Sequence, residues 1–175
     1  MSRSFRFRAA LACLVLAAPL LLPQGLLFPQ FLAAAHARNA SASPSAATLP
    51  QLIERAERGD ALAQLRLGNA LERGNLGVPQ NFIEAARWYR LAAEQGVAEA
   101  QFNLALMYRD GQGVSKSALR AHIWLNIAQS RYRKSDRTKR DLAVMLREGV
   151  SKRLTADEID EAQRHAVEWQ PKYLR

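Results

Sequence analysis

The chain has 175 residues, a formal net charge of +9 and a single cysteine, Cys13. Its length suggests one folded domain. A lone cysteine excludes a disulfide within the chain, so the folded body must be held by its hydrophobic core. A body of this size can bury enough apolar surface for that purpose.

The first 37 residues differ in composition from the rest. Three arginines precede a stretch, residues 9–36, that contains no Lys, Arg, Asp or Glu. Ala35-His36-Ala37 then matches a small-residue cleavage site. This order is typical of a secretory signal peptide, so residues 1–37 are predicted to direct export.

An uncleaved N-terminal membrane anchor is the alternative, because residues 9–36 are long enough to span a bilayer. Pro19, Pro23 and Pro29 would interrupt such a helix. In both cases the body is expected in the periplasm, free or held at the inner membrane. Cys13 lies inside the apolar stretch instead of at its end, so lipid attachment there is not expected.

The excess of positive charge persists after the predicted export segment. Removing Arg3, Arg6 and Arg8 lowers the net charge from +9 to +6. A basic chain can indicate nucleic-acid binding, but the export signal argues against that partner. Anionic lipid headgroups and acidic proteins fit the expected location better, and a simple solvated surface explains the charge equally well.

Residues 38–48 are small and polar and are predicted to be a flexible linker. Residues 49–58 then have the spacing of a short amphipathic helix, with Leu52, Ile53 and Ala56 on one face. Thr48 is placed to cap this helix, with Gln51 answering three residues later.

Residues 59–95 and 96–131 are two copies of one pattern. Gly59 and Gly96 are 37 residues apart, and one extra residue after Leu76 reduces the later offset to 36. Identical residues recur in register at Ala61/Ala98, Ala63/Ala100, Gln64/Gln101, Leu67/Leu104, Gly74/Gly111, Gly77/Gly113, Val78/Val114, Ala85/Ala121, Trp88/Trp124 and Ala92/Ala128. A repeat of this length indicates a solenoid, and solenoids mostly bind other proteins.

Each copy is predicted to fold as two helices joined by a glycine-rich turn. The first copy predicts helices from Ala61 to Arg73 and from Asn81 to about Gln95, with a capping box between Asn81 and Glu84. The second predicts helices from Ala98 to Arg109 and from Ser117 to about Ser130. Repeated alanines allow close helix approach, and Trp88 and Trp124 are predicted to fill the core between hairpins.

Residues 132–175 are predicted to form a basic linker and two capping helices that cover the open end of the solenoid. A basic patch spans the junction: Arg131, Arg133, Lys134, Arg137, Lys139 and Arg140. Thr155 and Glu158 form the capping box of the last helix, and Pro171 follows its end.

The repeated pattern, A-x-A-Q-x-x-L-G followed by G-x-G-V and A-x-x-W-Y-x-x-A-A-x-Q-G, resembles the Sel1-like repeat, a relative of the tetratricopeptide repeat. The second copy departs from it at Ala105, Leu125 and Gln129. The resemblance implies an all-α fold: a short right-handed α-solenoid of helix–turn–helix repeats with C-terminal capping helices. It also implies an adaptor or scaffold for protein complexes, without a catalytic residue set or a cofactor.

The residues themselves give little support to an enzyme. Outside the export segment the histidines are His122 and His165, and neither has a second metal ligand at a suitable spacing. Glu94 and Glu99 flank a helix junction and are expected to be solvated carboxylates. No metal site and no cofactor are therefore expected.

The expected function is binding of a partner protein on the concave face lined by the first helix of each repeat. Its outward positions are Arg66, Asn69, Arg73, Asn103 and Asp110. Two alternatives stay open: an envelope hydrolase acting on peptidoglycan or β-lactams, and a module that contacts anionic membranes through the basic stretch 131–140.

Overall fold

The computed structural model describes residues 48–172, and within this range every helix or strand assigned is an α-helix. The predicted export segment and nearly all of the predicted linker lie outside the described residues. The helices of the described part are α2 (Leu49–Glu57), α3 (Ala61–Arg73), α4 (Phe82–Glu94), α5 (Ala98–Asp110), α6 (Ala118–Arg131), α7 (Arg137–Ser151) and α8 (Ala156–Glu168). None of them is both long and apolar enough to cross a membrane.

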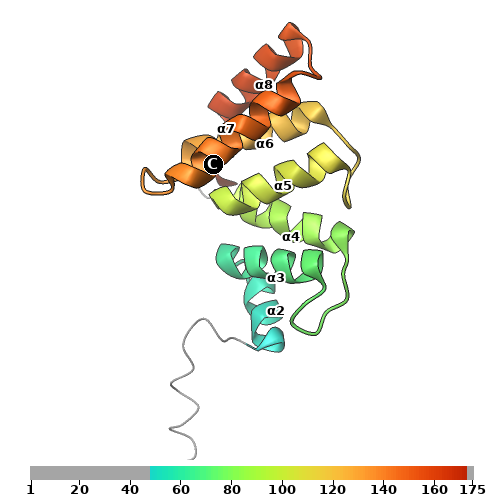
Figure 1. The fold of residues 1–175 in the computed structure, drawn as a ribbon. Coiled ribbons are helices and arrows are strands. Elements are labelled where there is room, and N and C mark those ends of the chain that lie inside the picture. Colours follow the sequence, from blue (N-terminus) through green and yellow to red (C-terminus); the bar gives the residue numbers. More distant parts are fainter. Residues whose placement is uncertain (1–47, 173–175) are drawn as a thin grey trace, which may run out of the picture. The chain divides into compact units, whose positions relative to one another are not determined.

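The helices from α2 to α6 each pack against the next one along the chain (Figure 1). α3 and α4 form one hairpin, α5 and α6 form a second, and α4 packs against α5 to join the two. Each hairpin thereby covers the apolar face of its neighbour, which is how a solenoid builds a continuous core. The predicted all-α repeat architecture is confirmed.

Short polar side chains begin α3, α4 and α6, whereas α5 begins after Val97 without a side-chain cap. The Asp60 carboxylate accepts the backbone N–H groups of Leu62 and Ala63, both at 3.0 Å, at the start of α3. Asn81 accepts from the N–H of Glu84 at 3.1 Å, and Ser117 begins α6 in the same way. These bonds satisfy N–H groups that have no partner within their own helix.

One predicted cap differs from the structure. At α4 the reciprocal bond of a capping box, from the Asn81 backbone to the Glu84 side chain, is not formed. Glu84 Oε2 lies instead 3.4 Å from Arg87 Nη1, one turn further along the helix. The predicted capping box of α8 is present, because Glu158 Oε2 accepts the Thr155 N–H at 2.8 Å.

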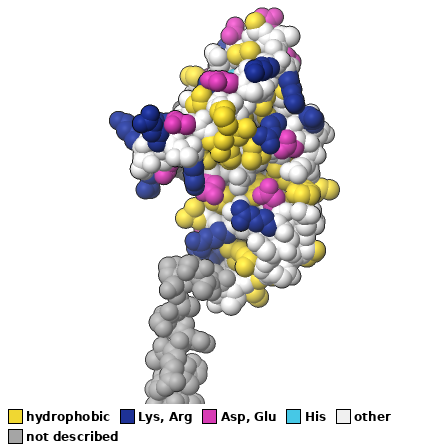
Figure 2. Space-filling model, in the orientation of Figure 1, with side chains coloured by type: hydrophobic (Ala, Val, Ile, Leu, Met, Phe, Trp, Pro, Cys, Tyr) yellow, Lys and Arg dark blue, Asp and Glu magenta, His cyan; other side chains and the backbone are white. Residues whose placement is uncertain are grey.

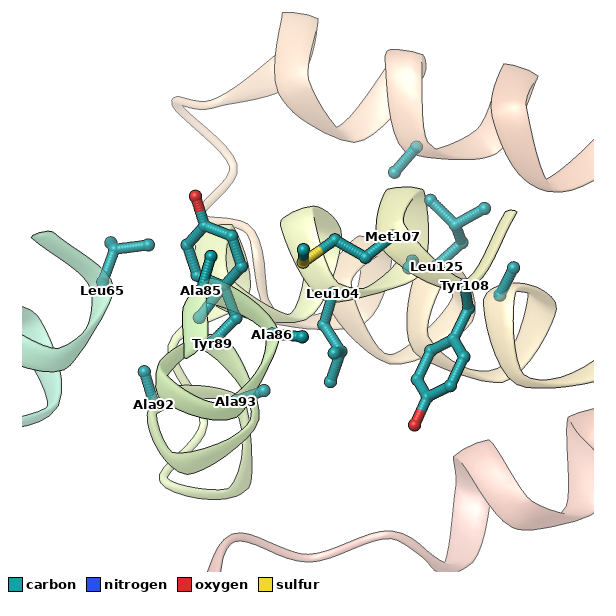
Figure 3. Packing of buried hydrophobic residues seen from close by; sticks show 14 of the residues in the cluster. Leu65, Ala85, Ala86, Tyr89, Ala92, Ala93, Leu104, Met107, Tyr108 and Leu125 are labelled. Atoms are coloured by element: carbon teal, nitrogen blue, oxygen red, sulfur yellow. The ribbon is translucent and has the colours of Figure 1, made fainter. Parts of the chain in front are cut away.

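The main core runs continuously through both hairpins. Figure 3 shows Tyr89 of α4, Leu104 and Met107 of α5 and Leu125 of α6 in one cluster. Alanines on α4, α5 and α6 surround them and are fully buried, at 0% exposure for Ala85, Ala92, Ala93, Ala100, Ala105, Ala121 and Ala128. Small side chains at these positions allow neighbouring helix backbones to approach closely.

The repeated glutamines tie each hairpin to the helix before it. Gln64 Nε2 donates to the carbonyl of Ala56 at 3.0 Å, and Gln101 Nε2 donates to the carbonyl of Ala93 at the same distance. Both acceptors lie in the last turn of a helix, where carbonyls lack an intrahelical partner. The glutamine of the repeat pattern therefore closes the end of the preceding helix.

The prediction that Trp88 and Trp124 fill the core needs correction. Both side chains are partly buried and pack against the edge of the core. The next residues in the chain, Tyr89 and Leu125, are the ones at 0% exposure. An α-helix turns by about 100° per residue, so the residue after the tryptophan takes the central position.

The C-terminal cap also differs from the prediction. α7 covers α6 as the first helix of a further hairpin would, but α8 packs mainly against α6 instead of closing over α7. The chain after α8 then returns along the repeats: Trp169 lies edge-on to Trp124, with ring centroids 6.2 Å apart, and Pro171 is fully buried. The open end of the solenoid is covered by α7, and α8 covers the side of α6.

Candidate functional site

The predicted binding residues of α3 and α5 lie on one continuous polar surface, called here the α3–α5 face: Arg66, Asn69, Arg73, Asn103 and Asp110. Arg66, Asn69 and Arg73 follow each other at spacings of three and four residues and therefore share one side of α3. Asn103 Nδ2 donates to Asn69 Oδ1 at 3.2 Å, which joins α3 of the first repeat to α5 of the second. The two asparagines are partly buried, whereas Arg66, Arg73 and Asp110 are exposed.

A buried tyrosine supports this face from below. The Tyr89 hydroxyl lies 2.7 Å from Asn69 Oδ1 and 2.5 Å from Glu72 Oε2. A phenol has one proton, so it donates to one of these acceptors at a time. Burial of the ring, together with the Glu72 carboxylate, raises the pKa of Tyr89 far above its usual value, and the hydroxyl stays a donor.

The contact between Glu72 and the Tyr89 hydroxyl was not predicted from the sequence. Tyr89 is part of the repeat pattern, and Glu72 comes 17 residues before it in the chain. Its position three residues after Asn69, on the same side of α3, is the signal that could have indicated it. The face is therefore more acidic at its centre than the predicted residues suggested.

Asp110 is not an isolated carboxylate at the end of this face. Its two oxygens accept from Nε and Nη2 of the adjacent Arg109, at 2.8 and 2.7 Å. The hydrogen bonds from Arg109 lower the pKa of Asp110 below its usual range, and the carboxylate stays charged. A partner would meet a neutral ion pair at this position.

The six basic residues from Arg131 to Arg140 surround the turn between α6 and α7 and are called the basic tip. Figure 2 shows Lys and Arg side chains gathered on the turn that projects there. Three of them have partners: Lys139 Nζ is 3.1 Å from Glu99 Oε2, Arg137 Nε is 3.6 Å from Asp141 Oδ2, and the Arg131 guanidinium lies 4.9 Å from the centre of the Trp169 ring. No ion pair within residues 48–172 involves Arg133, Lys134 or Arg140.

The side chains considered for catalysis are dispersed. His122 is buried in α6, and His165 is exposed on α8 with Nε2 3.6 Å from Glu161 Oε1. Glu94 lies 3.7 Å from Lys172 Nζ, whereas Glu99 pairs with Lys139, so the two carboxylates belong to separate ion pairs. Across residues 48–172, no three His, Cys, Asp or Glu residues are grouped as metal ligands would be.

Two hollows lie away from the α3–α5 face. One, of about 310 Å³, is bounded by Glu94, Trp124, Trp169, Gln170 and Lys172, where the chain after α8 crosses the repeats. A shallower one, of about 670 Å³, lies between the turns of the two repeats and includes Phe82, Ile83 and Val114. The two charged groups of the first hollow, Glu94 and Lys172, lie 3.7 Å from each other as an ion pair, and the residues that line the second are uncharged.

Stacked helical hairpins with a polar face and dispersed titratable groups define a protein of the helical-repeat solenoid class. Comparison with family models identifies the type of repeat. The Sel1 repeat model matches residues 61–97 and 98–128, and the chain therefore carries two Sel1 repeats. Proteins with this fold commonly serve as scaffolds for protein–protein interaction.

A solved structure agrees with this fold. It is the crystal structure of c5321, described as a protective antigen present in uropathogenic Escherichia coli strains displaying an SLR fold. It is 32% identical over 71% of this chain and 25% of its own, with a TM-score of 0.62. A Sel1 repeat protein from Oxalobacter formigenes is 24% identical over 67% of this chain and 47% of its own, with a TM-score of 0.48. This chain thus spans less than half the length of either protein. Comparison with curated proteins gave no match.

Proposed function

We propose that this chain is a non-enzymatic adaptor or scaffold of the bacterial envelope that binds a partner protein on its α3–α5 face. The observation that supports the proposal is the Asn69–Asn103 hydrogen bond. It makes the first helices of the two repeats one continuous surface, on which a partner can contact both repeats at once. A surface assembled in this way is what an adaptor needs, since each helix alone offers little area.

The charges on the face indicate what the partner presents. Arg66 and Arg73 are exposed, and Glu72 lies between them in sequence at the level of the asparagine pair. A segment that carries acidic side chains over the arginines and a hydrogen-bond donor over Glu72 would be complementary. The amides of Asn69 and Asn103 can bond to an extended backbone, which offers both donors and acceptors.

The proposed location in the envelope rests on residues 1–37, which have the composition of an export segment. Fusion of a periplasm-sensitive reporter enzyme to the C-terminus would test it in bacterial cells. Reporter activity that requires residues 1–37 is the expected result. Activity that persists after their deletion would contradict export by this segment.

The binding face is tested by placing a photo-crosslinking amino acid at position 66 or 73 in living cells. Both positions should capture the same partner protein, and a crosslinker at Arg164, exposed on α8, should not. The variant Arg66→Glu/Arg73→Glu should then capture at least tenfold less partner, because two attractive charges become repulsive. The matched control, Lys152→Glu/Arg164→Glu, makes the same charge change on exposed residues elsewhere.

Equal capture by both double variants would remove the α3–α5 face from the proposal. Circular dichroism melting of each variant must show the wild-type transition, so that lost capture reports binding and not unfolding.

The hydrolase alternative has no observation in its favour, because Glu94 and Glu99 pair separately with Lys172 and Lys139. Turnover of muropeptides or nitrocefin by the purified chain would nevertheless overturn the proposal of a non-enzymatic protein.

A further inference from the structure

The basic tip is a defined projection and not a loose charged segment. α6 ends at Arg131 and α7 begins at Arg137, so residues 132–136 form the turn between them, which projects from the helices (Figure 1). Tyr132 is partly buried, and its ring packs edge-on against Phe102 of α5, with centroids 6.5 Å apart. This contact holds the base of the turn against the second repeat.

The charges at the outer end of the projection are not balanced by the protein. Asp136 is the single acidic residue in the segment from 131 to 140. Glu99 and Asp141 offset Lys139 and Arg137 at the base, and Arg131 lies over Trp169. Arg133 and Lys134 are exposed in the turn itself, whereas Arg140, one turn into α7, is partly buried. None of the three is in an ion pair within residues 48–172, so they are the cations of the tip left for an external anion.

Two apolar side chains of α7 are exposed as well. Leu142 and Met145 of α7 are 40% and 60% exposed, and their spacing of three residues places them on one side of the helix. They remain exposed because α8 packs mainly against α6, so α7 lacks the helix that closes the other hairpins. Leu142 comes one turn after Lys139, and Met145 lies one turn from both Asp141 and Glu148. A surface that combines cations with exposed apolar side chains is characteristic of a membrane interface.

We propose that the basic tip, with Leu142 and Met145, is a contact surface for the anionic face of a lipid bilayer. The shape of the tip favours a bilayer over an acidic protein. A projecting turn would require a protein partner with a matching acidic hollow, whereas a bilayer presents phosphates over a plane that a projection can approach directly. The cations bind headgroup phosphates and the two apolar side chains enter the headgroup layer.

Vesicle flotation of the full chain tests this surface. We expect binding to phosphatidylcholine vesicles that contain phosphatidylglycerol to exceed binding to pure phosphatidylcholine, and the difference to shrink as salt is added. The variant Arg133→Gln/Lys134→Gln/Arg140→Gln should lose roughly 100-fold in affinity for the anionic vesicles, since each cation contributes about fivefold. The first 37 residues are common to every variant, so their contribution cancels in the comparison.

The matched control is Lys152→Gln/Arg153→Gln/Arg164→Gln. It removes the same charge from exposed residues at the far end of α7 and on α8, about 20 Å from the tip along the helix. It should keep at least a tenth of the wild-type affinity. A third variant, Leu142→Ser/Met145→Ser, should bind the anionic vesicles about tenfold more weakly, because two apolar side chains no longer enter the headgroup layer.

Three results would overturn the proposal: no preference for anionic vesicles, equal losses in the tip variant and the control, or unchanged binding of the tip variant to anionic vesicles. Equal losses would mean that net charge alone attracts the chain to the vesicles. Each variant should show the wild-type circular dichroism melting curve, since every substituted side chain except the partly buried Arg140 is exposed. No residue of the α3–α5 face is replaced in the tip variant, so partner capture there provides an independent measurement.

Discussion

A Cβ atom on Gly68 of α3 would lie 2.7 Å from both Cδ1 and Cε1 of the Tyr89 ring on α4. The ring can be fully buried only because position 68 has no side chain. The second repeat has Ala105 in place of Gly68 and Leu125 in place of Tyr89. The repeat without the aromatic ring therefore has a methyl group at the glycine position. Glycine with tyrosine and alanine with leucine are thus two solutions to one packing problem.

A double-mutant cycle measures this relationship. Gly68→Ala should destabilise the wild-type chain by about 1–2 kcal/mol, because the ring must move and overpacking outweighs the better helix propensity of alanine. In a Tyr89→Leu background the same substitution should be neutral or stabilising by up to about 1 kcal/mol. Urea unfolding of the four proteins gives the coupling energy, and additive effects would show that the ring and Gly68 do not compete for space.

A second glycine lies at the contact between repeats. A Cβ atom on Gly113 would lie 2.1 Å from the Phe82 carbonyl oxygen, and its φ is +66°. Gly113→Ala should therefore cost more than about 3 kcal/mol, because a clash with backbone atoms is added to the strain of a left-handed alanine.

Gly77, the same position in the first repeat, is the matched control for this prediction. Its φ is +86°, but no atom lies within 4 Å of the place where a Cβ would be. Gly77→Ala should cost only the conformational strain, about 1–2 kcal/mol. Thermal unfolding of both variants measures the difference, and equal losses would mean that Gly113 is required for its φ alone.

The tryptophans of the repeats should contribute less to stability than their neighbours. Leu125 is fully buried, so Leu125→Ala is expected to cost about 2–5 kcal/mol through lost burial and the cavity it leaves. Trp124 is partly buried and loses mainly its edge-on contact with Trp169, so Trp124→Ala should cost about 1–3 kcal/mol. Chemical denaturation measures the free energy of unfolding of both variants. A greater loss for Trp124→Ala than for Leu125→Ala would show that Trp124 is the core residue.

The helices could be predicted from the sequence because each carries its own local signals: apolar residues at helical spacing, Asn81 or Ser117 at a start, Gly74 or Gly111 at an end. The choice between Trp88 and Tyr89 as the core residue could not be predicted from the sequence. Alanines on either side make the apolar stripe wide enough to include both, and only the position of α3 selects one. Local sequence signals thus determine where the helices of the repeats begin and end. Which residue lies at the centre of the core depends on the angle between helices.

The same limit applies to the candidate site and the cap. Helical spacing predicts that Asn69 shares one side of α3 with Arg66 and Arg73. It could not show that Nδ2 of Asn103, in the next repeat, lies 3.2 Å from Asn69 Oδ1. The direction of α8 was also hidden, because residues after Arg131 no longer follow the repeat and no internal copy shows where they pack. Long-range contacts without a repeated precedent are therefore the part that the sequence left open.

His122 should make stability depend on pH as the pH falls below about 6.5. The side chain is 2% exposed, and its Nδ1 has no hydrogen-bond partner among the described residues. Burial disfavours the charged imidazolium, and the Arg147 guanidinium adds repulsion, so the pKa of His122 is lowered from 6.5. The unfolded chain therefore binds a proton first as the pH falls, and the stability present above about pH 6.5 is progressively lost below it.

Urea unfolding at neutral and mildly acidic pH measures this loss, whose slope for a single group is at most about 1.4 kcal/mol per pH unit. His122→Gln removes the titrating group, so its stability should change much less over the same interval, whatever its absolute value. His165→Gln, a substitution on the exposed surface of α8, should keep the wild-type slope. The lowered carboxyl pKa values of Asp60 and Asp110 act below about pH 4 and do not overlap with this window. A His122→Gln variant with the wild-type slope would assign the acid sensitivity to other groups.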